Sequence, residues 1–454
     1  MNYPITDPAL RWLEVIFAER FGHAWHLTRT PADLRLQLSG AVGAIVFDKL
    51  EDGFTQAHSD QPCAWWDASG EGWHSVLGGV LPAPGVAKLP APLIETRAGE
   101  HIIHYDIPGL IYWMLARVEE IGRTDLDNHE RFPATSSHAY KHGYLDRPVV
   151  DEWLHVLGQV IERQWPGIEL KRHEFQMRVS HDVDRPTRYG FASPRNLLRR
   201  MAGDLSRGAV SAALAGPWVR INTKTRLHHA DPFNTFDWIM DQSEESGLKS
   251  AFFFICGRTS RMDGEYDLAH PALRDLLRRI HSRGHEIGLH PSYNTFNNAK
   301  ELKLEADHLR SVCKEEGIHQ DCWGGRMHYL RWQQTTTMRA WAEAGMDYDS
   351  TLSYADHAGF RCGTCFEYPA FDAVASESLA VRERPLITME ASVLSEKYMG
   401  CAQANAEDVF RDLKGKCEKL SGSFTLLWHN SELADRNSKS LYSKIISSNE
   451  GLAR

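Results

Sequence analysis

From residue 175 onward the sequence alternates short apolar segments with longer amphipathic ones, and this alternation is the strongest constraint on the fold. The apolar segments predict strands at 175–180, 249–256, 286–290 and 423–429. The amphipathic segments predict helices at 234–246, 271–283, 298–316, 333–345 and 406–420. Strands and helices that alternate at this length are typical of a parallel sheet or barrel. In such folds the functional residues lie at the carboxyl ends of the strands.

The first 170 residues show a different pattern, with helical segments separated by short strand-like ones and a Pro- and Gly-rich stretch at 80–97 that predicts a loop. Helices are expected at 8–21, 107–121 and 150–165. We therefore predict two domains. The first is an α+β domain over 1–170, and the second is an α/β domain over 171–454.

The charge balance argues against a nucleic-acid partner. The chain has 51 basic and 60 acidic residues, a net charge of −9, whereas a protein that binds a phosphate backbone needs a basic face. The Arg-rich stretch 186–230 is a local exception that includes Arg195, Arg199 and Arg200. Three interpretations of it are open: a solvated helical insertion, a lid over the site, or a contact to a substrate phosphate.

Composition also limits where the chain is expected to act. No run approaches the roughly 18 apolar residues of a membrane-spanning helix, and the first residues lack the basic and apolar regions of a signal peptide. We therefore expect a cytoplasmic protein. Eight irregularly spaced cysteines are too few for a disulfide scaffold, and the lone pair Cys362 and Cys365 has no second pair to build a zinc ribbon.

Two acidic residues close the first strand of the second half. Asp182 and Asp184 are two residues apart, so their side chains point the same way from a strand. Two ionised carboxylates side by side repel each other, which costs free energy unless a cation or a proton separates them. His290 ends another strand and is a candidate metal ligand, and Asn294 offers an oxygen four residues later. Taken singly, each segment is better explained by a turn or by a backbone-bonded side chain than by a functional site.

Two later segments carry further polar groups at strand ends. His328, Tyr329 and Arg331 follow Gly324-Gly325 and Arg326, and such a group can orient carboxylates and bind polar parts of a substrate. Trp428 and His429 end the last strand, where a histidine can act as a general acid and a tryptophan can stack on a sugar.

Several familiar enzyme classes are disfavoured. His285, Glu286 and His290 resemble the zincin motif with one residue too many, so the two histidines share neither a helix face nor a strand face. The chain has no Gly-x-Ser-x-Gly elbow, no Walker loop and no Gly-x-Gly-x-x-Gly after a strand. A serine hydrolase, a nucleoside-triphosphate enzyme and a dinucleotide oxidoreductase are therefore not expected.

The order of these segments resembles the polysaccharide deacetylase family, the NodB-homology carbohydrate esterases, over roughly 175–435. The stretches that carry the resemblance are Ser180-His-Asp-Val-Asp184, Gly284-His-Glu-Ile-Gly-Leu-His-Pro-Ser-Tyr-Asn294, Gly325-Arg-Met-His-Tyr-Leu-Arg331 and Leu426-Leu-Trp-His429. The resemblance implies a distorted (β/α) barrel. Before residue 170, the stretches 106–120, 131–134 and 143–153 resemble an accessory domain of one bacterial subgroup, which implies a role in surface polysaccharide metabolism, lipopolysaccharide included.

The resemblance also implies roles for individual residues. Asp182 would be the general base, Arg326 would orient it, and His429 would be the general acid. Asp184 and His290 would bind a divalent metal, with zinc expected and manganese, cobalt or iron as alternatives. Asn294 stands where the family has its second metal histidine, and an amide oxygen is a weaker zinc ligand than imidazole. The site could therefore use another ion, recruit a further ligand such as His181 or His328, or have lost its metal. His181 is the less favoured ligand, because strand alternation turns it away from Asp182 and Asp184.

The function implied is metal-dependent N-deacylation, in which an amide bond of an acylated amino sugar is hydrolysed. The substrate would be a bacterial surface polysaccharide or a lipid- or nucleotide-linked precursor of it. Two alternatives remain at this stage because of Asn294, together with the extra N-terminal domain for the first and the aromatic residues Trp332 and Trp428 for the second. One is acyl transfer to or from an amino sugar on the same fold, and the other is a glycan-binding protein whose metal site has decayed.

Overall fold

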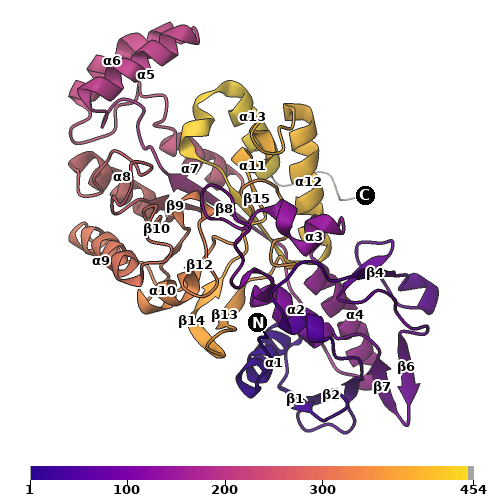
Figure 1. Cartoon of the computed structure of the whole chain (residues 1–454). Coiled ribbons are helices and arrows are strands. Elements are labelled where there is room, and N and C mark those ends of the chain that lie inside the picture. The colour runs from indigo at the N-terminus through magenta and orange to yellow at the C-terminus, as the bar shows by residue number, and fades with distance from the viewer. Residues whose placement is uncertain (1, 448–454) are drawn as a thin grey trace.

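The computed structural model describes residues 2–447 and contains two main sheets, one in each half of the chain (Figure 1). The N-terminal sheet has the strand order β1-β2-β3-β7-β6. Its strands are β1 (Trp25–Arg29), β2 (Leu34–Leu38), β3 (Ile45–Phe47), β6 (Ile94–Arg97) and β7 (Glu100–Ile103). A separate two-stranded ribbon pairs β4 (Cys63–Trp66) with β5 (Leu81–Pro84). The helices of this half are α1 (Asp7–Phe21), α2 (Ile107–Leu115), α3 (His138–Lys141) and α4 (Val149–Gln164).

The second half is built around a nine-stranded sheet with the order β13-β14-β12-β11-β10-β9-β8-β16-β15. Its strands are β8 (Gln176–Val183), β9 (Ser250–Phe254), β10 (Glu286–Leu289), β11 (Gly324–Gly325), β12 (Tyr348–Asp349), β13 (Tyr368–Asp372), β14 (Glu377–Glu383), β15 (Thr388–Met389) and β16 (Ser423–Leu427). Neighbouring strands are parallel except for the β13–β14 pair. The predicted parallel α/β architecture is confirmed. Within residues 2–447 the sheet runs from β13 to β15 without closing, so the barrel stays a prediction.

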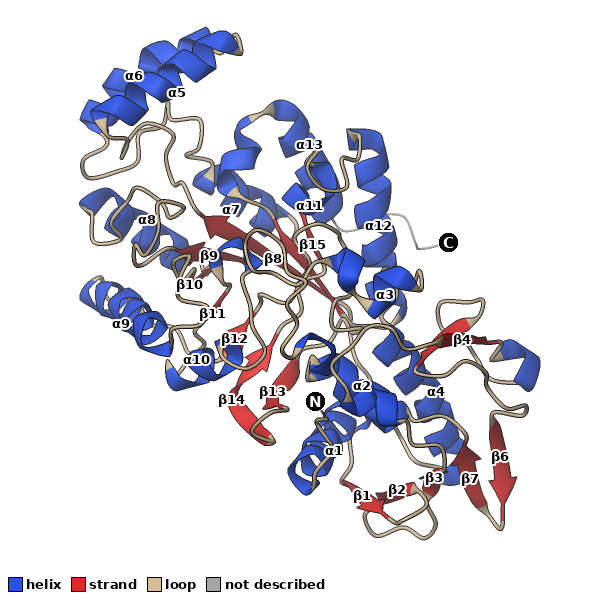
Figure 2. Cartoon of the chain, viewed as in Figure 1, coloured by secondary structure: helices blue, strands red, loops and turns tan. Residues whose placement is uncertain are grey.

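Helices flank this sheet, with α8, α9 and α10 to the left of the strands and α12 and α13 to their right in Figure 2. The helices of this half are α5 (Pro194–Ser206), α6 (Val210–Asn222), α7 (Phe236–Glu245), α8 (Pro271–Ser282), α9 (Ala299–Glu315), α10 (Thr337–Glu343), α11 (Glu390–Leu394), α12 (Gln403–Lys419) and α13 (Arg436–Ile446). In α8, the leucines 273, 276 and 277 and Ile280 are buried at helical spacing, so one apolar stripe packs on the sheet.

The two halves share one apolar core. Trp12 of α1 is buried, and its ring is tilted against that of Phe371, with the ring centroids 5.2 Å apart. Its indole nitrogen donates to the Pro369 carbonyl at 2.8 Å. Asp151 of α4 accepts from the Thr364 hydroxyl at 2.8 Å. Burial of this kind holds the N-terminal half firmly against the large sheet. The predicted boundary at residue 170 remains a prediction.

Candidate metal centre

Two carboxylates project from the carboxyl end of β8, as the alternation of a strand requires. Asp182 is 3% exposed, and its Oδ1 accepts from Arg326 Nη1 at 2.8 Å. The next carboxylate, Asp184, lies just beyond the strand, with its Oδ1 3.2 Å from His290 Nε2 and 3.4 Å from His328 Nε2. The strand end therefore presents one carboxylate paired with a guanidinium and one that faces two imidazoles.

Both histidines follow strands that neighbour each other in the sheet. His290 comes directly after β10, and its Nδ1 lies 2.6 Å from the Arg326 carbonyl oxygen. His328 follows β11, and its Nδ1 lies 3.0 Å from Asp263 Oδ1. Because a carbonyl and a carboxylate only accept hydrogen bonds, both rings carry a proton on Nδ1. Each Nε2 is thereby turned toward Asp184, the arrangement in which an outer partner fixes the tautomer of a metal-binding histidine.

These three side chains fit a divalent metal ion. One ligand atom from each of Asp184, His290 and His328 lies within 4.8 Å of the others. Asp184 Oδ1 is buried and receives no hydrogen bond of good geometry, so a cation would satisfy it. One carboxylate oxygen and two imidazole nitrogens form a donor set that zinc and related ions accept.

The electrostatics of the cluster follow from its composition. Burial opposes ionisation of Asp184, yet the positive field of His328 and its histidine neighbours lowers the pKa of that carboxyl below its usual range. Burial also opposes the charged form of His290, but the carboxylates of Asp182 and Asp184 raise its pKa. The pocket thus favours a negatively charged Asp184 beside positive charge. A bound cation could supply that positive charge in place of the histidine protons.

The end of the last long strand supplies the remaining polar group. His429 follows β16, its Nδ1 lies 2.5 Å from Glu390 Oε1, and its Nε2 lies 3.8 Å from Asp184 Oδ2. Burial works against the charged imidazole, but Glu390 overcomes it and raises the pKa of His429 to about 10. A protonated Nε2 therefore faces the same space as the metal-binding atoms.

The position of Arg326 depends on two glycines. A Cβ on Gly325 would overlap the Leu289 carbonyl oxygen, and one on Gly324 would overlap the Tyr348 ring. Glycine at both positions lets β11 lie close to its neighbours, and the Arg326 amide then donates to the Leu289 carbonyl at 3.0 Å. Further bonds from Arg326 to the Ser350 carbonyl at 2.8 Å and hydroxyl at 3.0 Å fix the guanidinium beneath Asp182.

Two residues predicted for the site lie outside the ligand cluster, and a third lies in it with a different placement. Asn294 is exposed, donates to the Thr259 carbonyl at 2.9 Å and accepts from Arg331 at 3.3 Å, so the structure does not bring it to the cluster. His328, predicted to bind substrate and also considered as a recruited metal ligand, lies in the third ligand position. Arg331 donates to the backbone carbonyls of His129 and Tyr293 and pairs with Glu130, and it does not line the cavity.

Trp428 is also placed differently from its predicted role in sugar binding. Its side chain is fully buried in the core, 5.8 Å from the Phe410 ring and 5.5 Å from the Tyr442 ring. Consecutive side chains of an extended segment point to opposite sides. Since His429 points into the cavity, Trp428 points toward α12 and α13.

A small cavity of about 140 Å³ adjoins the ligand cluster. The lining residues are Arg131, Asp182, Asp184, His290, His328, Tyr329, Leu330, Met389, Ala391, Tyr398 and His429. Arg131, Tyr398 and the supporting Glu390 and Asp263 were not predicted as site residues. Glu390 follows the short apolar segment 385–389 at a strand end, so the same strand-end rule could have found it.

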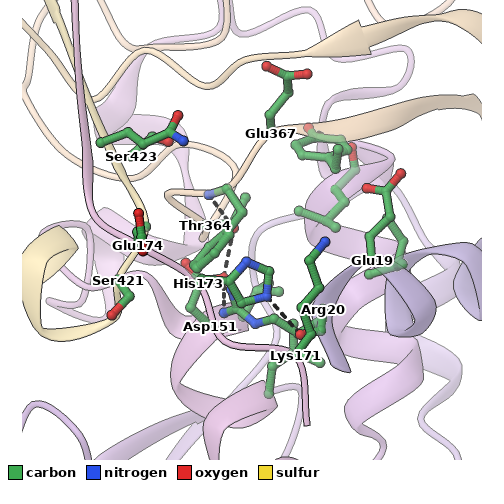
Figure 3. A pocket seen from close by; sticks show the side chains of 18 of the residues that line it. Glu19, Arg20, Asp151, Lys171, His173, Glu174, Thr364, Glu367, Ser421 and Ser423 are labelled. Carbon is green, nitrogen blue, oxygen red and sulfur yellow. Dashed lines mark hydrogen bonds and ion pairs between the residues drawn. The ribbon is translucent and has the colours of Figure 1, made fainter. Parts of the chain in front are cut away.

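A larger cavity, about 580 Å³, lies between the two halves at the amino ends of β8 and β16 (Figure 3). The polar groups in its lining bond to one another. Arg20 pairs with Asp151 at 2.7 Å, and His173 Nε2 lies 2.8 Å from the Arg20 carbonyl oxygen. Parallel α/β folds place their chemistry at the opposite end. Size alone therefore does not make this cavity the functional site.

Comparison with known proteins adds little about function. A family model described as a family of unknown function, DUF7033, matches residues 5–166. This match covers less than half of the chain. No curated protein matches.

Two solved structures are similar at low level. One is described as a "putative polysaccharide deacetylase from Mycobacterium smegmatis", with 18% identity, a TM-score of 0.37, and coverage of 62% of this chain and 84% of that one. The other is the Puue allantoinase, with 12% identity, a TM-score of 0.36, and coverage of 62% and 85%. At these scores neither likeness decides the chemistry, so the site is argued from its own geometry.

Proposed function

We propose that this protein is a metal-dependent amide hydrolase that removes an acyl group from the nitrogen of an amino sugar. The observation that carries the proposal is the convergence of a ligand triad, a carboxylate clamped by arginine and a charged histidine on one cavity. Asp184, His290 and His328 would hold the ion. When bound, a divalent ion polarises a carbonyl and lowers the pKa of water.

Asp182 is suited to act as the base. Its Oδ1 is occupied by Arg326, and its Oδ2 faces the ligand cluster, 3.8 Å from His290 Nε2. The clamp leaves one oxygen oriented to take a proton from an attacking water. A positioned base of this kind typically contributes about 10²–10⁴-fold to a rate.

His429 is suited to act as the acid. The hydrogen bond from Nδ1 to Glu390 leaves the Nε2 proton directed at the cavity. When an amide bond breaks, the leaving nitrogen needs a proton, and His429 Nε2 can supply it. A base 3.8 Å from one ligand and an acid 3.8 Å from another match the needs of amide hydrolysis, since one proton is removed from water and one is given to the amine.

The amino-sugar substrate is inferred from the family resemblance of the four strand-end segments, and the cavity is compatible with it. Tyr329 and Tyr398 line the cavity beside the ligand cluster and offer aromatic rings to a sugar. The acyl-transfer and glycan-binding alternatives relied in part on Asn294 as a defective ligand. With His328 available as the third ligand, that argument loses its force.

The test is turnover by the metal-loaded protein on a panel of N-acylated hexosamines, as free sugars and as nucleotide- and lipid-linked forms, with release of free acid and free amine measured. We expect hydrolysis that requires added zinc or cobalt. Asp182→Asn should lower it at least about 100-fold with metal content unchanged. Asn294→Ala is the matched control and should keep full activity. Unchanged turnover in Asp182→Asn, or no amine from any substrate by the metal-loaded protein, would overturn the proposal.

A further inference from the structure

Between β8 and α7 the chain leaves the sheet and forms a helical hairpin, α5 and α6, which stands away from the rest of the molecule (Figure 1). The two helices pack on each other through Leu197, Met201 and Val219. Gly216 lies at the contact, where a Cβ would be 3.1 Å from Met201 Cγ. The hairpin therefore has its own small core, and its outer side chains are not needed to hold it together.

Both helices of the hairpin carry exposed apolar residues. In α6 the exposed residues 210, 214, 218 and 221 recur at helical spacing and form one stripe, and in α5 residues 198 and 205 are two turns apart on one face. Their exposed fractions are Leu198 67%, Leu205 50%, Val210 49%, Leu214 71%, Trp218 62% and Ile221 60%. Six of the fifteen large apolar side chains that are exposed among residues 2–447 thus lie on this hairpin. Clustered exposed apolar residues mark an interaction surface.

The hairpin is also strongly basic. Residues 193–226, which span the hairpin and the four residues after α6, contain seven Lys and Arg residues and one acidic residue, a net charge of +6 in a chain whose net charge is −9. The basic residues are Arg195, Arg199, Arg200, Arg207, Arg220, Lys224 and Arg226. Within the described part of the chain, Arg195, Arg199 and Lys224 take part in no ion pair. Arg195 and Arg199 are exposed, and they flank the exposed Leu198 on α5.

We infer that the hairpin α5–α6 docks the protein on the surface of an anionic lipid bilayer. A helix with an apolar stripe beside Lys and Arg lies in the bilayer interface, with the apolar residues among the acyl chains and the cations at the headgroups. Trp218 belongs to the residue type that favours this boundary. The docking is peripheral, because among residues 2–447 no helix is long and apolar enough to cross a bilayer.

Other occupants fit the hairpin less well. A second copy related by two-fold symmetry would place the exposed Arg195 and Arg199, which form no ion pair within the described residues, near their own copies, so like charges would face each other. A nucleic acid would match the charge, but its phosphate backbone offers nothing to six apolar side chains. An anionic bilayer satisfies both the charge and the apolar stripe. This inference does not depend on the proposed reaction.

The test is co-sedimentation of the full chain with vesicles of phosphatidylcholine alone or mixed with phosphatidylglycerol. We expect binding to the mixed vesicles, little binding to phosphatidylcholine alone, and weaker binding at high salt. The double variant Leu214→Gln, Trp218→Gln should reduce the partition coefficient at least about tenfold, since both side chains are exposed in the free protein. The matched control is Val42→Gln, Leu304→Gln, which changes exposed apolar residues elsewhere and should bind like the parent.

Two results would overturn the inference. One is the absence of binding to mixed vesicles at low salt. The other is equal binding by the Leu214, Trp218 variant and the Val42, Leu304 control. Sedimentation velocity of the same proteins without lipid distinguishes the second-copy alternative, since a dimer that dissociates only in the Leu214, Trp218 variant would assign the hairpin to self-association instead.

Discussion

Replacement of Arg326 by methionine is the sharpest test of the candidate site's architecture. Arg326 is fully buried, and its partner Asp182 is 3% exposed. The substitution keeps an unbranched apolar side chain of similar reach but removes the charge that Asp182 faces. Loss of one partner of a buried ion pair typically costs about 3–5 kcal/mol, because the other charge is left without compensation. His290 Nε2 lies 3.8 Å from Asp182 Oδ2 and compensates in part, so we expect about 3 kcal/mol.

The assay is chemical denaturation of metal-free protein, and the decisive quantity is the coupling in a double-mutant cycle with Asp182→Asn. Once Asp182 is neutral, the loss of Arg326 leaves no unpaired charge, so the double variant should be about 2 kcal/mol more stable than the sum of the single effects predicts. The matched control is the cycle of Arg331→Met with Glu130→Gln. Glu130 is 63% exposed, so its coupling should stay below about 1 kcal/mol. Equal coupling in the two cycles would refute the assignment of Asp182 to a buried, arginine-clamped position.

Three further outcomes are expected. His328→Ala should weaken zinc binding, measured by competition with a chelating dye, by at least about 100-fold, whereas Asn294→Ala should leave it unchanged; the reverse order would restore Asn294 as the ligand. Burial raises the pKa of Asp106 to about 6, so its contribution to stability is full below about pH 4 and is lost as the pH rises through 6. In denaturant titrations the free energy of unfolding of Asp106→Asn should therefore rise by up to about 3 kcal/mol relative to that of the parent between pH 4 and pH 7. Parallel pH profiles of the two proteins would disprove this. Gly325→Ala should destabilise the fold by more than about 2 kcal/mol, because its Cβ overlaps the Leu289 carbonyl; a melting temperature like that of the parent would contradict the close strand approach.

The regular elements of the second half were predictable because their patterns are local. The helix expected at 271–283 is α8, and the strand expected at 249–256 contains β9. The stretch 80–97, predicted as a loop, was wrong in part, since it contains β5 and β6. In β5 the prolines 82 and 84 cannot donate to a ladder, and they are tolerated because this strand pairs with β4 alone.

The third metal ligand shows the limit of local pattern. Asn294 is four residues from His290 and therefore looks like its partner in the sequence. His328 is 38 residues away, and it reaches the cluster because β10 and β11 are neighbours in the sheet. The strand that places it is only two glycines long, too short for a periodic signal. Strand order, rather than spacing, decides which histidine meets Asp184.

The cavity wall extends this argument to the N-terminal half, in which no site residue was predicted. Arg131 lines the cavity, donates to the Tyr329 carbonyl at 2.9 Å and to the Tyr398 hydroxyl at 3.3 Å, and is itself held by Asp127 at 2.8 Å. Tyr329 has a φ of 62°, a left-handed conformation that is costly for a bulky residue and needs support from its surroundings. Because that support comes from Arg131, a chain cut to the predicted second domain, 171–454, would lose both a wall of the cavity and the residue that holds Tyr329 beside His328. The N-terminal half is thus part of the candidate site rather than an addition to it.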